Sequence, residues 1–380
     1  MNHMPGNRVM FVYGTRPEAI KCAPIIRAFE QADDFDVSVT LTGQHPDMVR
    51  PINAGFGIAA DFNLDIFKPG QSLSEIAAKT MSRLTPVLEE HRPDALFVQG
   101  DTTSALASGL AAFHERIPLV HIEAGLRTAS ITSPFPEEGN RRLLSQIASL
   151  NLAATAGNKE NLIASGVPSD KIVVTGNPVI DALHMAAALP HEISEPLVAQ
   201  FVASDRQLVL VTSHRRESWG EPMRQIAAAL RALAQQETET VFVFPLHANP
   251  AVRDYFVPVL QQLPNVALVE PLDYFDMAKL LASSTLVLTD SGGLQEEAPA
   301  LGKPVLVLRN DTERPEGVAA GTAELVGHDP ERIVGRTTQL LHDPVEYAKM
   351  AHAVNPYGDG HAAERTLLAV RSWIADGAAI

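Results

Sequence analysis

Residues 289–317 contain the densest group of side chains and backbone amides suited to binding a phosphorylated ligand. An apolar run ends there, and a polar turn follows it directly. That turn consists of Asp290, Ser291, Gly292 and Gly293. Two glycines after a strand let the backbone approach a ligand closely, and free amides at the start of the next helix favour an anion such as phosphate. Glu296 and Glu297 follow one turn later and could reach sugar hydroxyls, so we predict a nucleotide or sugar-phosphate pocket.

Three carboxylates in the first half of the chain stand where acid–base chemistry is expected. Glu123 falls at the end of an apolar run, where a carboxylate is costly unless it is paired or functional. Asp101 follows another such run, and it could serve either as a helix N-cap or as a catalytic group. Glu137 opens a predicted helix, where an acidic residue is also favoured by the helix dipole alone.

Basic residues and histidines occupy other strand ends. Arg16 and Lys21 follow the first predicted strand and could clamp phosphates, although solvated charges at a helix start are an equal alternative. Their spacing is not that of a P-loop. His214 stands beside two arginines, which suits anion binding or proton transfer, with a solvated basic loop as the alternative. His247 lies in a similar loop. No His-Glu-x-x-His motif or cluster of metal ligands is present, so we predict no metal site.

The elements that must carry these residues alternate between apolar strands and amphipathic helices. In the first half the predicted strands are Val9–Tyr13, Val37–Thr42, Ala95–Val98 and Leu119–Ile122. In the second half they are Leu208–Thr212, Val241–Phe244, Val266–Val269, Leu286–Thr289 and Val305–Leu308. Alternation of this kind predicts parallel sheets with helices on both faces, and continuously apolar strands agree with it.

We therefore predict an α/β protein with two doubly wound domains that face a central cleft. The expected boundaries are 1–175 for the first domain and 176–360 for the second, with a hinge near 175–195. Residues 361–380 are expected to form a helix that packs back on the first domain. Ligands of such sheets bind at the carboxyl ends of the strands.

Composition narrows the classes of function. The 380 residues carry a net charge of −15, which argues against nucleic acid or an anionic membrane as the main partner. Cys22 is the only cysteine, so no internal disulfide and no cysteine-rich zinc site is expected. No signal-peptide pattern and no run of 18 apolar residues occurs, so we expect a cytoplasmic location.

Taken together, these segments resemble the non-hydrolysing UDP-N-acetylglucosamine 2-epimerases from about Val9 to His361. The matching segments read GTRPEAIKCAPII, TGQH, GDTTSALA, HIEAGLRT, SPFPEEGNRR, TGNPVIDAL, SHRRES, DSGGLQEEAPALGKPVLVLR, TERPEG and NPYGDG. The resemblance implies a glycosyltransferase-B-like pair of Rossmann domains, a homodimer, and no cofactor. It also implies interconversion of UDP-N-acetylglucosamine and UDP-N-acetylmannosamine through elimination of UDP to a 2-acetamidoglucal.

The resemblance also implies roles for individual residues. Asp101, Glu123 and Glu137 would be the acid–base carboxylates, with His214 as a further catalytic group. The UDP-sugar would be bound by Arg16, Lys21, Gln44, His247, Phe275, Ser291, Gly292, Gly293, Glu297 and Arg314. The match leaves open which carboxylate acts on which face of the sugar.

One departure concerns a second, activating UDP-N-acetylglucosamine that some bacterial members bind. Two positions of that site read Asp47 and Gly70 here, where the family pattern has a glutamine and an arginine. The alternatives for the function are a hydrolysing epimerase, an epimerase of a related UDP-diacetamido-uronate, a glycosyltransferase of the same fold, and a catalytically silent sugar-nucleotide sensor.

Overall fold

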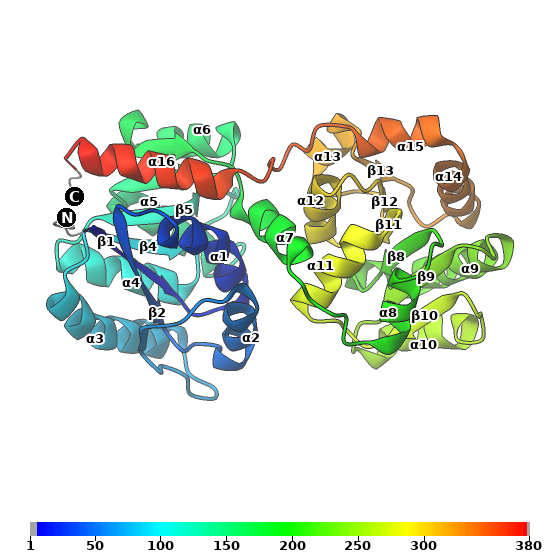
Figure 1. The fold of residues 1–380 in the computed structure, drawn as a ribbon, viewed down its shortest axis with the longest axis horizontal. Helices are drawn as coiled ribbons and strands as arrows, with labels where there is room; N and C mark the ends of the chain where they lie inside the picture. The colour runs from blue at the N-terminus through cyan, green and yellow to red at the C-terminus, as the bar shows by residue number, and fades with distance from the viewer. Residues whose placement is uncertain (1–5, 378–380) are drawn as a thin grey trace. The chain divides into compact units, whose positions relative to one another are not determined.

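The computed structural model describes residues 6–377, and the chain divides there into two compact units. Unit 1 comprises the residues up to Ala182 together with the segment that begins at Gly358, and unit 2 runs from Leu183 to Tyr357. Figure 1 shows both as layered α/β units with a central sheet. The chain thus leaves unit 1 within helix α7 (Pro178–Ala188), whereas the sequence pattern predicted a boundary at 175/176.

Unit 1 contains a seven-stranded parallel sheet in the order β3-β2-β1-β4-β5-β6-β7. Its strands are β1 Asn7–Tyr13, β2 Phe35–Leu41, β3 Phe62–Asn63, β4 Ala95–Gln99, β5 Leu119–Ala124, β6 Leu150–Ala153 and β7 Ile172–Val174. Its helices include α1 Arg16–Glu30, α2 Pro46–Phe56, α3 Leu73–His91, α4 Thr103–His114, α5 Glu137–Ile147, α6 Ala156–Ala164, part of α7, and α16 Ala362–Ala375. Helix α16 packs along α1, and Arg371 on it pairs with Asp34 at 2.7 Å.

Unit 2 contains a six-stranded parallel sheet in the order β10-β9-β8-β11-β12-β13. Its strands are β8 Leu208–Thr212, β9 Val241–Pro245, β10 Val266–Val269, β11 Leu286–Thr289, β12 Val305–Val307 and β13 Ala323–Leu325. Its helices include α8 Pro196–Val202, α9 Glu221–Gln236, α10 Pro250–Leu260, α11 Tyr274–Ser283, α12 Gly292–Ala300, α13 Pro315–Ala320, α14 Pro330–His342 and α15 Pro344–Ala351.

Both sheets therefore follow the doubly wound strand order, which confirms the predicted fold class. In each unit the chain winds outward from a first central strand and then reverses beside it, between β1 and β4 in unit 1 and between β8 and β11 in unit 2. Loops diverge at such a switch point, so the carboxyl ends of these strands are the expected places for ligands.

Several short elements were not predicted. Helix α2 begins at Pro46 and contains Pro51, and two prolines in eleven residues obscure the helical pattern. Strands β3 and β13 have two and three residues, too few for a periodic signal. The segment 189–196 was expected to lead directly into β8, but the seven-residue helix α8 lies between them.

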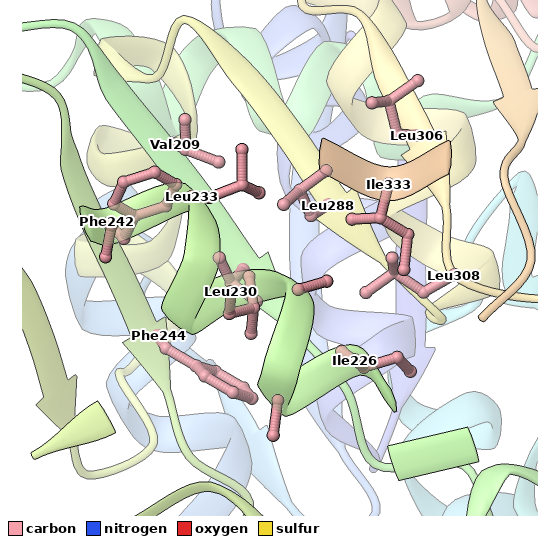
Figure 2. Close-up of a cluster of buried hydrophobic side chains, with 14 of the residues drawn as sticks. Val209, Ile226, Leu230, Leu233, Phe242, Phe244, Leu288, Leu306, Leu308 and Ile333 are labelled. Atoms are coloured by element: carbon pink, nitrogen blue, oxygen red, sulfur yellow. The ribbon is translucent and has the colours of Figure 1, made fainter. Parts of the chain in front are cut away.

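The core of unit 2 is formed by apolar side chains from the sheet and from the helices packed on one of its faces. Figure 2 shows Leu230 and Leu233 of α9 against Val209, Leu288 and Leu306 of the sheet. All five side chains are buried. This core fixes the sheet, and the sheet in turn fixes the loops at its carboxyl edge.

We expect Leu288→Ala to lower the free energy of unfolding of unit 2 by about 2–5 kcal/mol, because it leaves a cavity in a fully buried position. Urea denaturation followed by circular dichroism measures the change. Leu197→Ala is the matched control, since that leucine is 37% exposed and should cost much less. Equal losses in the two variants would contradict this account of the core.

Candidate active site

Lys21 and Glu123 form the central ion pair of unit 1. Lys21 lies on α1, directly after β1, and its Nζ is 2.6 and 2.5 Å from the two carboxylate oxygens of Glu123 at the end of β5. The amide of Gln99, the last residue of β4, also donates to Oε2 of Glu123 at 2.5 Å. The second turn of α1 and the ends of β4 and β5 thus meet at one carboxylate.

The backbone of Glu123 adopts a left-handed conformation. Its φ is 61°, and the pairing of β5 with β6 shifts register between Ile122 and Ala124. A residue with a side chain is rarely found in this region, and such strain is concentrated at functional sites. Gly125 follows with φ 94°, where an added Cβ would lie 2.3 Å from the carbonyl oxygen of Asn158. The bulge therefore re-aims the carboxylate of Glu123 at the edge of the sheet.

Asp101 lies in the turn between β4 and α4, and residues of α5 hold it. Arg141 forms an ion pair with Oδ2 of Asp101, with Nε at 2.9 Å. Asn140 donates to the backbone carbonyl of Asp101 at 2.8 Å. Nε2 of the buried His121 lies 2.7 Å from the carbonyl oxygen of Gly100, and burial lowers the pKa of His121, so the neutral ring acts as a hydrogen-bond donor there.

The adjacent acidic residues Glu137 and Glu138 have different environments at the start of α5. Glu137 is the first helical residue and is partly exposed. Glu138 is buried, lies 3.2 Å from Arg141 and 2.6 Å from Arg142, and accepts the amide of Thr128. Burial by itself raises the pKa of Glu138, but the hydrogen bonds and neighbouring arginines lower it overall. Glu138 therefore supports the structure, and Glu137 remains available for chemistry.

Arg16, Gln44 and Glu18 surround the turn after β1. Arg16 begins α1 and is exposed, while Oε1 of Gln44 accepts the hydroxyl of Ser104 at 2.6 Å. The buried Glu18 accepts the amides of Gly14 and Thr15, both at 2.8 Å. Burial raises the pKa of Glu18. Gly14 is required because an added Cβ would lie 1.8 Å from Oγ1 of Thr42.

In unit 2 the switch point is organised around Asp290, whose side chain is fully buried. Its Oδ2 accepts the hydroxyl of Ser213 at 3.2 Å and the amides of His214 and Arg215 at 2.6 and 2.9 Å. Its Oδ1 lies 3.2 Å from Nδ1 of His214. Burial raises the pKa of Asp290, but the hydrogen bonds from His214 and Arg215 outweigh it and leave the pKa below its ordinary value.

This geometry corrects one expectation. The sequence pattern placed Asp290 in the phosphate-binding turn, but its carboxylate faces the loop after β8 and accepts two backbone amides of that loop. The amide of Ser291 is likewise taken, since it donates to Oγ1 of Thr289 at 2.8 Å. Gly292 and Gly293 open α12, and as its first residues their amides have no intrahelical carbonyl to bind. They remain the candidate anion-binding amides.

The other predicted residues of unit 2 lie on helices α11 and α12, in the loop after β9 and directly before α13. The ring of His247, after β9, stacks on that of His214 with centroids 5.6 Å apart and planes 9° apart. Glu297 is partly exposed on α12, and its Oε1 lies 3.9 Å from the position of a Cβ built on Gly293. Arg314 forms an ion pair with Glu296. Phe275 is buried near the start of α11.

One group of side chains has the composition of a metal site. His191, Asp273 and Asp276 offer ligand atoms within 4.8 Å of one another. Each already has a structural role, because Asp276 lies 2.6 Å from Nε2 of His191 and binds Ser194, while Asp273 caps α11. These contacts attach the segment before α8 to α11.

Two contacts of the candidate site were not predicted from the sequence. Arg141 follows Glu137 by four residues, so helical spacing places the two on the same face of α5, and this signal could have identified it. The pairing of Asp290 with the β8 loop joins residues more than 70 positions apart, and no local pattern reveals it.

Comparison with known proteins matches the chain to one family. The family model for UDP-N-acetylglucosamine 2-epimerase matches residues 27–371. The chain is 44% identical to the UDP-N-acetylglucosamine 2-epimerase of Salmonella typhimurium, over 96% of this chain and 99% of that protein. It is also 44% identical to the enzyme of the same name from Escherichia coli K12, over 96% and 98%.

Two solved structures extend the comparison to the fold. A UDP-GlcNAc 2-epimerase from Neisseria meningitidis bound to UDP-GlcNAc has a TM-score of 0.89 and 44% identity, over 96% of this chain and all of that one. The Methanocaldococcus jannaschii enzyme in complex with UDP-GlcNAc and UDP has a TM-score of 0.70 and 30% identity, over 96% and 99%.

We expect the Lys21–Glu123 pair to show a coupling energy of about 0.5–3 kcal/mol in a double-mutant cycle of Lys21→Met and Glu123→Gln. The reason is that Lys21→Met alone leaves a largely buried carboxylate without its cation, whereas the amide of Glu123→Gln needs none. Urea denaturation of the four proteins measures the coupling.

The control cycle uses Arg27 and Glu30, an exposed pair on the same helix, for which about 0.2–0.5 kcal/mol is expected. A Lys21–Glu123 coupling no larger than this control would refute the central role given to the pair.

Proposed function

The chain belongs to the UDP-N-acetylglucosamine 2-epimerase family, and from this premise we propose that it is an isomerase that interconverts UDP-N-acetylglucosamine and UDP-N-acetylmannosamine. The observation that carries the proposal is the carboxylate of Glu123, which stands at a strand end beside Lys21 and Gln99 on a residue with a strained backbone. Asp101 stands at the end of the neighbouring strand β4. Carboxylates fixed in this way suit proton transfer at a carbon atom.

The proposed reaction proceeds by elimination and re-addition. A carboxylate removes the proton from C2, the electron pair of the C2–H bond forms the C1–C2 double bond, and the bond from C1 to the UDP oxygen breaks. The products are UDP and a 2-acetamidoglucal. Protonation of C2 on the opposite face and return of UDP to C1 give the epimer. The net change is inversion at C2, so no nicotinamide or other redox cofactor is required.

We assign the proton transfers to the carboxylates of unit 1 and the retention of UDP to groups of unit 2. Bases for both faces of C2 would come from Asp101, Glu123 and Glu137, and their order of action is open. Arg16 and Lys21 supply positive charge for the departing diphosphate. Gln44 would contact the sugar.

In unit 2, His214 and the amides of Gly292 and Gly293 would hold the diphosphate, and Glu297 would accept the ribose hydroxyls. Arg314 and Phe275 would bind the uridine, and His247 would lie on the sugar side. An amide pair at a helix start favours an anion because of both its free donors and the helix dipole.

The proposed oligomeric state, location and use of the product follow from the likeness to the family. We propose a homodimer, a cytoplasmic location, and a product used as an N-acetylmannosamine-type precursor of surface polysaccharide. None of the helices in residues 6–377 has the length and apolar character needed to span a bilayer. A second UDP-N-acetylglucosamine would lack two of its usual contacts, because Asp47 and Gly70 occupy those positions.

Incubation of the enzyme with UDP-N-acetylglucosamine in heavy water should produce the manno epimer with deuterium at C2, read by proton NMR. Label is expected because the abstracted proton exchanges with solvent before C2 is reprotonated. Epimer that forms without label would refute the elimination mechanism.

The same spectra distinguish the alternatives. Stoichiometric UDP and free N-acetylmannosamine would identify a hydrolysing enzyme, and UDP binding without turnover would identify a sensor. A panel of other UDP-sugars tests the related uronate substrates. Turnover that appears only when an acceptor is added would identify a glycosyltransferase.

The isosteric variants Asp101→Asn, Glu123→Gln and Glu137→Gln should each lower kcat by about 10²–10⁴-fold, the usual contribution of a positioned acid or base. UDP binding, measured by calorimetry, should persist, since these groups act on the sugar. Glu30→Gln on the exposed face of α1 is the control and should retain activity. Wild-type rates in all three variants would overturn the assignment.

A further inference from the structure

The buried carboxylate of Asp290 dictates where the proton of His214 resides. Its Oδ2 is occupied by three donors from residues 213–215. Its Oδ1 has no hydrogen-bond partner among the described residues, and Nδ1 of His214 lies 3.2 Å from it, within ion-pair distance. An ionised carboxylate can only accept hydrogen bonds. The two backbone amides and the Ser213 hydroxyl bound to Oδ2 favour the ionised carboxylate, so Nδ1 of His214 must carry a proton to face Oδ1.

The neighbouring aromatic ring restricts His214 in a second way. The ring of His247 lies parallel to it at 5.6 Å, and Nδ1 of His247 accepts the amide of Asn249 at 3.1 Å. An acceptor at Nδ1 requires that His247 be unprotonated there, so its neutral form carries the proton on Nε2. The two stacked rings thus have opposite tautomers, and the stack opposes rotation of His214 out of its contact with Asp290.

Another titratable group near Asp290 does not compete for this role. His328 interacts electrostatically with Asp290, but burial lowers the pKa of His328, and its ring is therefore neutral near neutral pH. The ion-pair partner of Asp290 is thus His214, whose side chain is 38% exposed and can reach a ligand through Nε2.

The place of this pair in the fold agrees with a function in binding or catalysis. Thr212 and Thr289, which end β8 and β11, are paired neighbours in the sheet, and their hydroxyls lie 2.6 Å apart. Asp290 directly follows Thr289, and His214 follows Thr212 after one residue, at the switch point of unit 2. A ligand at the carboxyl ends of these strands therefore meets Nε2 of His214 with Asp290 behind the ring.

We propose that Asp290 is a positioning residue for the epimerisation: it accepts the Nδ1–H of His214 and so favours the doubly protonated ring, whose Nε2–H donates a hydrogen bond to the diphosphate oxygen that departs from C1. This rests on the proposed function. When the C1–O bond breaks, its electron pair stays on that oxygen, and the imidazolium, stabilised by the Asp290 carboxylate, donates a hydrogen bond from Nε2–H to it without transferring the proton. When UDP returns, the electron pair forms the new C1–O bond, and both ring protons remain on His214 throughout.

The test is Asp290→Asn, which keeps the shape of the side chain. Its amide oxygen can still accept the backbone amides of the loop, and its NH₂ group then faces Nδ1 of His214 and forces the proton to Nε2. Nitrogen-15 NMR of labelled imidazoles, above the pH at which the ring protonates, should show Nδ1–H in the wild type and Nε2–H in the variant. The His214→Asn spectrum assigns the signal. We expect kcat to fall by about 10²–10⁴-fold, because the variant lacks the carboxylate that stabilises the imidazolium, with a much smaller change in UDP affinity.

Asp276→Asn is the matched control, because Asp276 is also a buried aspartate of unit 2 that binds a histidine, His191, and a backbone amide. It should leave the tautomer of His214 unchanged. Thermal unfolding of both variants separates loss of fold from loss of positioning, and a folded Asp290→Asn with the shifted proton supports the proposal. If Asp290→Asn does not fold, the wild-type spectrum still decides, since a proton on Nε2 there would overturn the proposal.

The failures of the two proposals are distinguishable. A wild-type enzyme that epimerises UDP-N-acetylglucosamine, with Asp290→Asn unchanged in tautomer or in kcat, overturns the role of Asp290 alone. A wild-type enzyme that turns over no UDP-sugar overturns the proposed function and with it the catalytic part of this inference, even where the tautomer follows Asp290.

Discussion

A carboxylate at the end of a buried parallel strand must find donors, and both units are arranged around that requirement. In unit 1, Glu123 is matched by Lys21 from helix α1 and by Gln99 from the neighbouring strand β4. In unit 2, Asp290 is matched by three donors from the loop after β8. Because an unpaired charge in such a place costs several kcal/mol, these contacts fix the loops that surround them. The positions of the candidate catalytic groups follow from them.

The two units supply these donors in different ways, and the surroundings of the two carboxylates suit different roles. Glu123 is held by side chains in a strained backbone and remains partly exposed, which suits a group that must gain and lose a proton. Asp290 is held chiefly by backbone amides and is sealed from solvent, which suits a group that must stay charged. Carboxylates at strand ends in two similar sheets thus have different surroundings, and we propose different roles for them.

Much of the fold was predictable from the sequence, because long apolar strands alternating with amphipathic helices leave few arrangements. The strand ends at Tyr13, Gln99 and Thr289 were predicted to within one residue, and with them the places of Lys21, Asp101 and Ser291. The orientation of the side chains was not predictable. Sequence does not reveal that Asp290 turns toward the loop of His214, or that Glu138 rather than Glu137 is buried, since both depend on contacts made by packing.

Helix α16 belongs to unit 1 although more than 170 residues of unit 2 separate it from the rest of that unit. The N-terminal unit is therefore incomplete while the chain is being made. Unit 2 is contiguous and can close its own core as soon as its last strand and helices leave the ribosome, whereas the surface of α1 that α16 covers stays bare until nearly the whole chain has emerged. The order of synthesis thus makes the second unit the first that can be finished.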